Sequence, residues 1–362
     1  MEENNKKEFY MRKALKLAEN GMGHTSPNPM VGCVVVRDGE IIAEGYHEKC
    51  GGFHAERNAL LSCEDARGAE IYVTLEPCCH HGKTPPCTDI IIEKQIKKVY
   101  VGSMDSNPLV SGKGVKLLQE AGIEVECGIL KEECDRLNEV FFHYIEQKTP
   151  YVVMKYAMTL DGKIAANTGD ARWVTGEKAR EDVHRLRKYY SGILVGIGTV
   201  KADNPMLNCR IEQGVDPVRI VCDSKLSIDE TCNLVTTAKD IKTIIAYTKE
   251  EEQKKKRLEA AGCILVKAGQ GEKVDLTILM KKLGELEIDS VLIEGGSEIH
   301  GAAIDAGIVD KVIVYIAPKV IGGKTSRTPV GGMGIEKMAD ALKLKHMDIQ
   351  MLGEDIRITG YL

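Results

Sequence analysis

Apolar residues in the first 146 positions follow two spacings, one typical of helices and one typical of strands. A helical spacing over residues 8–20 predicts an opening helix that ends at Gly21. Two apolar runs flank Asp38 and Gly39, a pair that is a strong signal for a β-hairpin. The full set is helices at 8–20, 54–61, 88–94, 115–121 and 132–145, and strands at 33–36, 41–45, 71–75, 99–102 and 123–127. This alternation predicts a sheet layered by helices.

The same alternation resumes after a short polar joint, residues 147–150, in which Pro150 forces the preceding residue into an extended conformation. Apolar strands are predicted at 151–155, 193–195, 218–222, 243–247, 264–266, 290–293 and 312–316, with helical stretches between most of them. A chain of 362 residues also exceeds one typical core. We therefore expect two α/β domains, residues 1–146 and 151–362, joined by a linker at 147–150.

Composition narrows the class of protein. Charged residues make up 28% of the chain and hydrophobic residues 43%, a soluble globular balance. The amino terminus is charged and no apolar stretch reaches the length of a membrane span, so we expect a cytoplasmic protein that does not enter the membrane. The net charge of -5 gives no basic surface for a nucleic acid. The twelve cysteines are scattered through apolar contexts and are expected to be reduced.

A group of potential zinc ligands stands out in the first domain. His54 is followed two residues later by Glu56, and Cys78 and Cys87 lie in a proline-rich loop downstream. One histidine and two cysteines can hold zinc tetrahedrally with the fourth position open, and Glu56 can reach a water molecule there. Cys79 is too close in sequence to Cys78 for both to face one metal comfortably, so Cys78 and Cys87 are the expected ligands and Cys79 is the fallback.

The spacing of the cysteines departs from the common zinc-deaminase signature, in which the second cysteine lies three residues after the first. Nine residues separate Cys78 from Cys87. A structural zinc site, or a chance His-x-Glu followed by buried thiols, is the simpler alternative. The combination of both motifs before helical stretches favours the catalytic interpretation.

Two glycine clusters follow predicted strands in the second domain. Residues 294–301 form a glycine turn that opens a helix, and residues 195–199 end another strand. Such turns can present bare backbone N–H groups to a phosphate. Neither matches the dinucleotide fingerprint of the doubly wound fold, so an ordinary tight turn is an equally good explanation for each.

Polar residues also concentrate between positions 173 and 210, around the only tryptophan of the chain. Solvated helix charge explains Arg185. Asp203 is harder to dismiss because it is expected to follow an apolar strand directly, and ligands bind at the loop ends of open sheets. By physics alone, this domain is a nucleotide- or phosphate-binding unit.

The motifs together resemble the bifunctional deaminase-reductases of riboflavin biosynthesis. The resemblance rests on residues 25–32, the pair His54 and Glu56, the loop 77–87 with its long cysteine spacing, and Lys155 followed by residues 159–162. It covers nearly the whole chain. It implies a cytidine-deaminase-like α/β/α domain followed by a dihydrofolate-reductase-like α/β domain, which would explain why the dinucleotide fingerprint is missing.

The resemblance also implies two consecutive reactions on small pyrimidine ribose phosphates. Zinc-dependent hydrolysis would remove the ring amino group of 2,5-diamino-6-(ribosylamino)-4(3H)-pyrimidinone 5'-phosphate. NADPH would then deliver hydride to the anomeric carbon and open the ribose to a ribityl chain. Zn²⁺ and NADPH are therefore the expected cofactors, and a homo-oligomer formed through the reductase domain is the expected assembly.

Matching positions give expected roles. His54, Cys78 and Cys87 are zinc ligands, and Glu56 is the proton donor. The deaminase substrate is expected to touch Asn28, His81 and Lys83. The expected NADP contacts are Ala157, Trp173, Thr199, Asp203, Ser224, Gly296, Ser297, Glu298, Ile299, His300, Gly301 and Ala302. The expected contacts of the reductase substrate are Lys155, Ala171, Arg187, Leu207, Arg210 and Glu294.

Some roles remain open at this level. Lys155 can anchor the substrate, assist ring opening or form a structural salt bridge. Two other functions also stay open: a deaminase of free nucleosides or RNA whose second domain only binds, and a regulatory protein stabilised by zinc. The acidic balance of the chain and the insertion at residues 80–83 count against the first.

Overall fold

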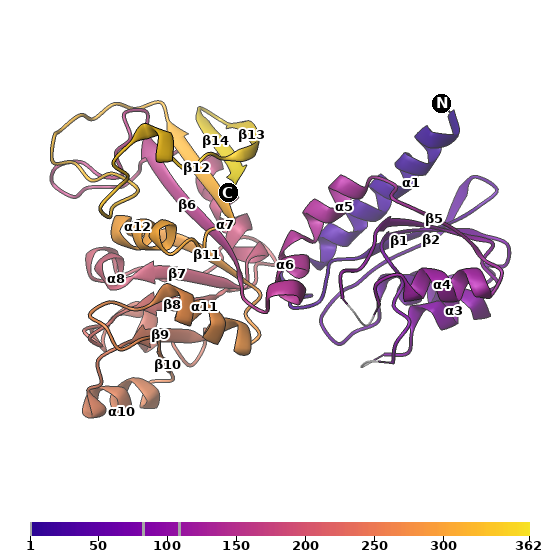
Figure 1. Cartoon of the computed structure of the whole chain (residues 1–362), viewed down its shortest axis with the longest axis horizontal. Helices are drawn as coiled ribbons and strands as arrows, with labels where there is room; N and C mark the ends of the chain where they lie inside the picture. Colours follow the sequence, from indigo (N-terminus) through magenta and orange to yellow (C-terminus); the bar gives the residue numbers. More distant parts are fainter. Residues whose placement is uncertain (1, 82–83, 108–109) are drawn as a thin grey trace. The chain divides into compact units, whose positions relative to one another are not determined.

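Two compact units make up the chain, Met1–Gln147 and Lys148–Leu362, and the junction between them lies inside the polar joint. The computed structural model describes residues 2–81, 84–107 and 110–362. Each unit is an α/β structure built on its own sheet, as the sequence predicts (Figure 1). None of the helices in these ranges combines the length and apolar character required to cross a bilayer.

The first unit alternates helices and strands. Its helices are α1 (Glu2–Ala18), the 3-10 turn η1 (Glu19–Gly21), α2 (Ala55–Ser62), α3 (Cys87–Glu93), α4 (Lys113–Glu120), α5 (Lys131–Leu137) and α6 (Glu139–Gln147). Its strands are β1 (Gly32–Arg37), β2 (Glu40–Tyr46), β3 (Glu70–Leu75), β4 (Lys98–Ser103) and β5 (Glu124–Cys127).

The sheet of this unit has the strand order β2-β1-β3-β4-β5. β1 pairs antiparallel with β2 and β3, whereas β3, β4 and β5 are parallel. The carboxyl ends of β3 and β4 therefore lie side by side at one edge, and the loops that follow the two strands begin there.

Both faces of this sheet are covered, because its central strands are apolar on both sides. Leu60, Ile91 and Leu118 from α2, α3 and α4 pack on one face. Met11 and Cys134 from α1 and α5 pack on the other. This is the expected α/β/α sandwich, and it holds the first turns of α2 and α3 at the edge where the loops meet.

One predicted helix, 132–145, is in fact two, α5 and α6, separated at Asn138. The buried side chain of Asn138 explains the break. Its oxygen accepts from the backbone N–H of Met30 and its amide group donates to the Met30 carbonyl, both at 2.9 Å. This long-range pair fixes the 27–31 loop, and helical periodicity alone gives no sign of it.

The second unit contains a larger sheet. Its helices are α7 (Glu177–Tyr189), α8 (Ile197–Asp203), α9 (Asn233–Thr236), α10 (Glu252–Ala260), α11 (Leu276–Glu285), α12 (Ser297–Asp305) and the 3-10 turn η2 (Met338–Asp340). Its strands are β6 (Tyr151–Thr159), β7 (Gly192–Gly196), β8 (Val218–Cys222), β9 (Thr243–Tyr247), β10 (Ile264–Lys267), β11 (Ser290–Gly295), β12 (Lys311–Ala317), β13 (Lys345–Leu352) and β14 (Asp355–Tyr361).

The strand order of this sheet is β10-β9-β8-β7-β11-β6-β12-β14-β13. Strands β6 to β12 are parallel, and β14 pairs antiparallel with β12 and β13. The helices α11 and α12 pack on one face and α8, α9 and α10 on the other. The central strands β6, β7 and β11 bring their carboxyl ends, and the residues that follow them, to one place.

The terminal hairpin β13–β14 is missing from the sequence prediction. Residues 347–351 do alternate between apolar and polar side chains, and Gly353 supplies the left-handed turn conformation, with φ 70°. The signal was therefore present in the sequence. β13 forms the edge of the sheet and is exposed along its length, so it lacks the continuous apolar run that marks the central strands.

Candidate functional sites

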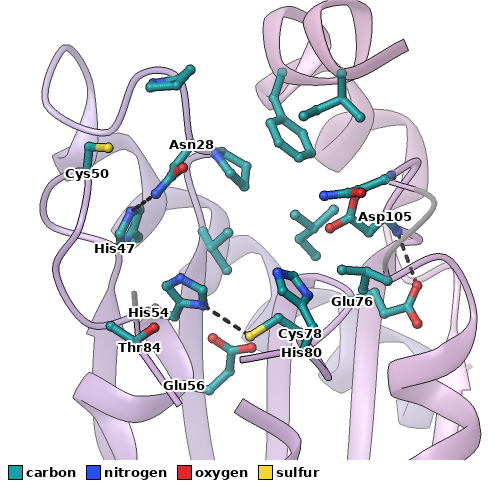
Figure 2. Close-up of a pocket in the computed structure, with 18 of the residues that line it drawn as sticks. Asn28, His47, Cys50, His54, Glu56, Glu76, Cys78, His80, Thr84 and Asp105 are labelled. Carbon is teal, nitrogen blue, oxygen red and sulfur yellow. Dashed lines mark hydrogen bonds between the residues drawn. The ribbon is translucent and has the colours of Figure 1, made fainter. Parts of the chain in front are cut away.

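Three potential metal ligands converge in the first unit. Figure 2 shows two of them, His54 and Cys78. His54 is the residue before α2, Cys78 lies after β3 and Cys87 is the first residue of α3. Their ligand atoms all lie within 4.8 Å of one another. The Nδ1 atom of His54 is 3.3 Å from the Cys78 sulfur and 3.5 Å from the Cys87 sulfur.

This geometry fits zinc. Bonds of about 2.3 Å to sulfur and about 2.0 Å to nitrogen at a tetrahedral angle place the two ligand atoms roughly 3.5 Å apart. Among the described residues the group consists of His54, Cys78 and Cys87, and Cys79 is not part of it. Three ligands leave a fourth position open, as in catalytic rather than structural zinc sites.

The environment favours a thiolate at this site. A hydrogen bond from the Cys87 thiol, followed by the hydrogen bond to His54, lowers the pKa of Cys78 to about 4. The backbone N–H of Cys87 also points at the Cys78 sulfur at 3.4 Å. A thiolate is the form that binds metal.

Glu56 lies in the first turn of α2 beside these ligands and is 3% exposed. Burial raises the pKa of its carboxyl group, and the charge of Cys78 adds to the effect. A carboxyl group with a raised pKa can take and release a proton closer to neutral pH. Glu56 is therefore placed and tuned for proton transfer.

His54, Cys78 and Glu56 line a pocket of about 330 Å³, and Cys87 lies behind its wall beside them. Its wall includes Asn28 from the loop before β1 and His47, the residue after β2, which face each other in Figure 2. Burial lowers the pKa of His47. The sequence drew attention to Asn28 but not to His47, because a lone histidine after a strand carries no signal of its own.

Two predicted substrate residues are placed differently. His81 is exposed and is not among the residues that line the pocket. Its neighbour His80 lines the pocket instead, and its buried Nδ1 atom has no hydrogen-bond partner among the described residues. Lys83 lies outside the described residues.

Glu76 connects the two loops at the mouth of the pocket. Its carboxylate accepts backbone N–H groups of Asp105 (3.3 Å), Gly112 (3.0 Å), Gly114 (3.1 Å) and Val115 (3.2 Å). Glu76 directly precedes Pro77 and Cys78, so the same short segment holds a potential metal ligand and the loop that follows β4. A glutamate immediately before the Pro-Cys pair was the only sequence clue to this role.

Asp105 is a further buried carboxyl group in the pocket wall. Burial raises its pKa to about 6, the negative charge of Glu76 adds to this, and the N–H of Asn107 acts in the opposite direction. No local pattern in the sequence singles out Asp105, since its burial depends on the meeting of two loops.

A second pocket, of about 720 Å³, lies at the carboxyl ends of β6 and β11 in the second unit. At its floor Glu294 is held between two cations: Arg187 donates at 2.7 and 2.9 Å, and Lys155 donates at 3.1 Å. Burial alone would raise the pKa of Glu294, but the two cations together hold it well below its usual range. Lys155 thus forms the salt bridge that the sequence left open.

A glycine turn forms another wall of this pocket. Gly295 has φ 151°, a conformation that favours glycine, and the turn leads into α12. A Cβ atom added to Gly296 would lie 3.3 Å from the Thr199 hydroxyl, so the bare backbone leaves room that a side chain would fill. Backbone N–H groups at such a turn suit a phosphate or a nicotinamide amide. The residues fit a nicotinamide cofactor.

Several other predicted contacts line the second pocket. They are Lys155, Ala157, Ala171, Trp173, Arg187, Arg210, Glu294, Gly296, Ser297 and His300. The guanidinium carbon of Arg180 lies 4.7 Å from the centre of the Trp173 ring. The Nη2 atom of Arg210 lies 3.2 Å from Nε2 of His184, within hydrogen-bonding distance.

The remaining predicted contacts do not line this pocket. They are Thr199, Asp203, Leu207, Ser224, Glu298, Ile299, Gly301 and Ala302. Leu207 is buried in the core, and Gly301 allows the backbone of Gly331 to approach α12 closely. The sequence predicted that Asp203 follows a strand directly, but this exposed residue is the last one of α8, and the rest of α8 separates it from β7.

Two family models match the chain, one for each unit. Residues 4–103 match the cytidine and deoxycytidylate deaminase zinc-binding region, and residues 150–358 match the RibD C-terminal domain.

Relatives match almost the whole length. The riboflavin biosynthesis protein RibD of Actinobacillus pleuropneumoniae is 56% identical over 349 residues, 96% of this chain and 93% of the relative. RibD of Escherichia coli strain K12 is 40% identical over 96% of this chain and 97% of the relative. The Thermotoga maritima diaminohydroxyphosphoribosylaminopyrimidine deaminase/5-amino-6-(5-phosphoribosylamino)uracil reductase is 39% identical, covers 99% of both chains and superposes with a TM-score of 0.89.

Proposed function

Because this chain belongs to the RibD family of bifunctional riboflavin-biosynthesis enzymes, we propose that its first unit deaminates a diamino-ribosylamino-pyrimidinone phosphate and that its second unit reduces the product. The observation that carries this proposal is the convergence of His54, Cys78 and Cys87 at a pocket whose wall also holds the buried Glu56.

In the first reaction, water replaces the amino group on an amidine-like ring carbon and ammonia leaves. Zinc held by His54, Cys78 and Cys87 would supply the Lewis acid that makes water nucleophilic near neutral pH. Glu56 takes the proton of the attacking water on its carboxylate oxygen and passes it to the departing amine. The wall of the pocket holds the ring so that this carbon faces Glu56.

In the second reaction, we propose NADPH as the hydride donor and the anomeric carbon of the ribose as the acceptor. The glycine turn before α12 supports binding of the cofactor, and Trp173 lies at the same pocket. Among the described residues Arg210 has no carboxylate within ion-pair distance, which leaves its guanidinium available for the sugar phosphate. Lys155 and Glu294 lie at the floor, where they can hold the ribose hydroxyl groups.

The direct test incubates the purified protein with 2,5-diamino-6-(ribosylamino)-4(3H)-pyrimidinone 5'-phosphate, with and without NADPH. We expect ammonia in both reactions and oxidation of NADPH only after deamination. NADH in place of NADPH tests the choice of cofactor. Absence of ammonia release by the zinc-loaded protein would overturn the proposal.

We also propose that the chain forms a homo-oligomer through β13. This strand ends the sheet, and Met347, Ile349 and Met351 are 55%, 63% and 63% exposed. Their alternate positions place them on one face of the strand. An exposed apolar edge strand normally needs a partner, and a second copy of the same edge supplies a matching one.

The cytoplasm is the proposed location. Each of the twelve cysteines, all within the described residues, is a free thiol. Free thiols, two of them metal ligands, suit a reducing compartment.

A further inference from the structure

His47 occupies a position in the deaminase pocket that neither metal binding nor proton transfer explains. It follows β2, is 2% exposed, and meets the ring of His54 edge-on with the ring centroids 5.3 Å apart. Both of its ring nitrogens have partners within the described residues, and neither partner is a charged group.

The first partner fixes the tautomer of the ring. Nδ1 of His47 lies 3.0 Å from the backbone carbonyl oxygen of Phe53. A carbonyl oxygen can only accept, so Nδ1 carries the hydrogen. In the neutral ring, Nε2 is then an acceptor.

The second partner is the side-chain amide of Asn28. Its Nδ2 atom lies 3.3 Å from His47 Nε2 and donates to it (Figure 2). The backbone beside it is also held, because the Asn28 N–H donates to the Thr25 carbonyl at 2.8 Å and prolines flank the residue. An amide group that is free to turn over presents either its oxygen or its nitrogen to a ligand. Here the nitrogen is committed to His47, which leaves the oxygen for the pocket.

We propose that His47 is a positioning residue that orients the Asn28 amide, so that the Asn28 oxygen accepts a hydrogen bond from an N–H or O–H group of the pyrimidine ribose phosphate. The inference rests on the proposed deaminase function. It adds the chain of contacts from the Phe53 carbonyl through His47 and Asn28 to the substrate. A fixed acceptor selects substrates with a donor at that position and holds the ring in a reactive orientation.

Substitution of His47 tests the chain of contacts. His47→Phe keeps a ring but removes both hydrogen bonds. In His47→Gln, the side-chain oxygen can take the place of Nε2 as the acceptor of the Asn28 amide hydrogen. We expect His47→Phe to raise the KM for deamination about ten-fold, the effect of one hydrogen bond, with a much smaller change in kcat. His47→Gln should restore most of the loss. Reduction of the deaminated product by the same proteins is the internal control.

Combining His47→Phe with Asn28→Leu separates positioning from a general structural role. If His47 acts through Asn28, the double variant should be no worse than Asn28→Leu alone, because both changes remove the same contact. Fully additive losses, or no rise in KM for His47→Phe, would overturn the proposal.

The orientation of the amide has its own test, which also decides the matter if His47→Phe fails to bind zinc. Asn28→Asp keeps an oxygen toward the pocket, so it should weaken substrate binding less than Asn28→Leu. If the amide nitrogen faced the substrate, the two variants would be equally damaging and the proposal would be wrong. If the proposed deaminase function were wrong, the wild-type protein itself would release no ammonia, and this result distinguishes that failure from a failure of the His47 proposal.

Discussion

Buried carboxyl groups at the two sites are tuned in opposite directions. Glu56 and Asp105 lie among apolar groups and negative charges, and burial raises both pKa values. Glu294 is equally buried but has Arg187 and Lys155 against it, and its pKa is lowered. The first pocket thus holds carboxyl groups that can carry protons, whereas the second holds a permanent carboxylate.

Glu56→Gln should abolish deamination without loss of zinc. The amide keeps the size of the side chain but cannot take up and release a proton, so we expect kcat to fall by about 10²- to 10⁴-fold. Ammonia release measures the loss, and metal analysis of the same sample should still give one zinc per chain. If Glu56→Gln retained activity, or if the zinc were lost with it, the assignment of Glu56 as the proton carrier would be wrong.

Asp105→Asn should stabilise the first unit at alkaline pH. A raised pKa in the folded state means that ionisation of Asp105 opposes folding. The stability present below the unfolded pKa, about 4, is lost as the pH rises through the folded pKa of about 6. The loss amounts to at most about 3 kcal/mol. Urea unfolding at pH 5 and pH 8 should show that the gain from Asp105→Asn is larger at pH 8; an equal gain at both values would contradict it.

At the scale of helices and strands, the spacing of apolar residues predicted the elements whose positions follow from local sequence alone. The apolar runs located the central strands, and His54 and Glu56 were correctly placed at the start of a helix. The break at Asn138 and the position of Asp105 depend on contacts between residues far apart in sequence, so no local pattern reveals them. The exposed strand β13 was missed because weak alternation at a sheet edge resembles a loop.

Arg219 is the clearest case of an element held by one side chain. It lies in β8 with no exposed surface, and it donates to the hydroxyls of Thr243 and Thr237 and to the carbonyls of Leu234 and Ile241. No carboxylate within the described residues pairs with it, and burial lowers its pKa. One guanidinium therefore ties α9 and the start of β9 to β8.

Arg219→Met should destabilise the second unit by about 3 kcal/mol or more, because several buried acceptors lose their donor together. Arg185→Met is the matched control, since Arg185 is exposed and pairs with Glu181 one helical turn away. That substitution should cost less than about 1 kcal/mol. Chemical unfolding followed in the second unit measures both, and similar values for the two variants would refute the role of Arg219.

Ile349→Lys should disrupt the oligomer proposed through β13. A charge at the centre of the apolar strand face cannot be buried against a second copy without a large desolvation cost. Sedimentation analysis should show a smaller species than for the wild-type protein. Leu286→Lys, which alters an exposed apolar residue at the end of α11, should leave the assembly intact. No change with Ile349→Lys would exclude this edge as the interface.

For the molecule as a whole, the two pockets belong to separate compact units and have no lining residue in common. A substitution in one pocket should therefore abolish one reaction and leave the other intact. The chemistry also has a fixed order, because the second unit uses the product of the first.

A mixture of two defective proteins should complete both reactions. Glu56→Gln lacks only the proton carrier of the first unit, and Arg210→Ala lacks only the phosphate contact proposed in the second. Alone, the first should release no ammonia, whereas the second should release ammonia and oxidise NADPH slowly. Together they should form the ribityl product after a lag, as the intermediate diffuses between molecules. Absence of product from the mixture would show that both reactions need one intact chain.

The carboxylate of Glu76 has a bearing on how the protein would acquire its metal. Four backbone donors tie the mouth of the pocket to the residue just before Pro77 and Cys78. Removal of zinc with a chelator should therefore leave the pocket folded, whereas a zinc finger unfolds when its metal is removed. The rate of zinc rebinding would then be limited by diffusion and by deprotonation of the ligands, and not by refolding. Deaminase activity should return as quickly as zinc is supplied.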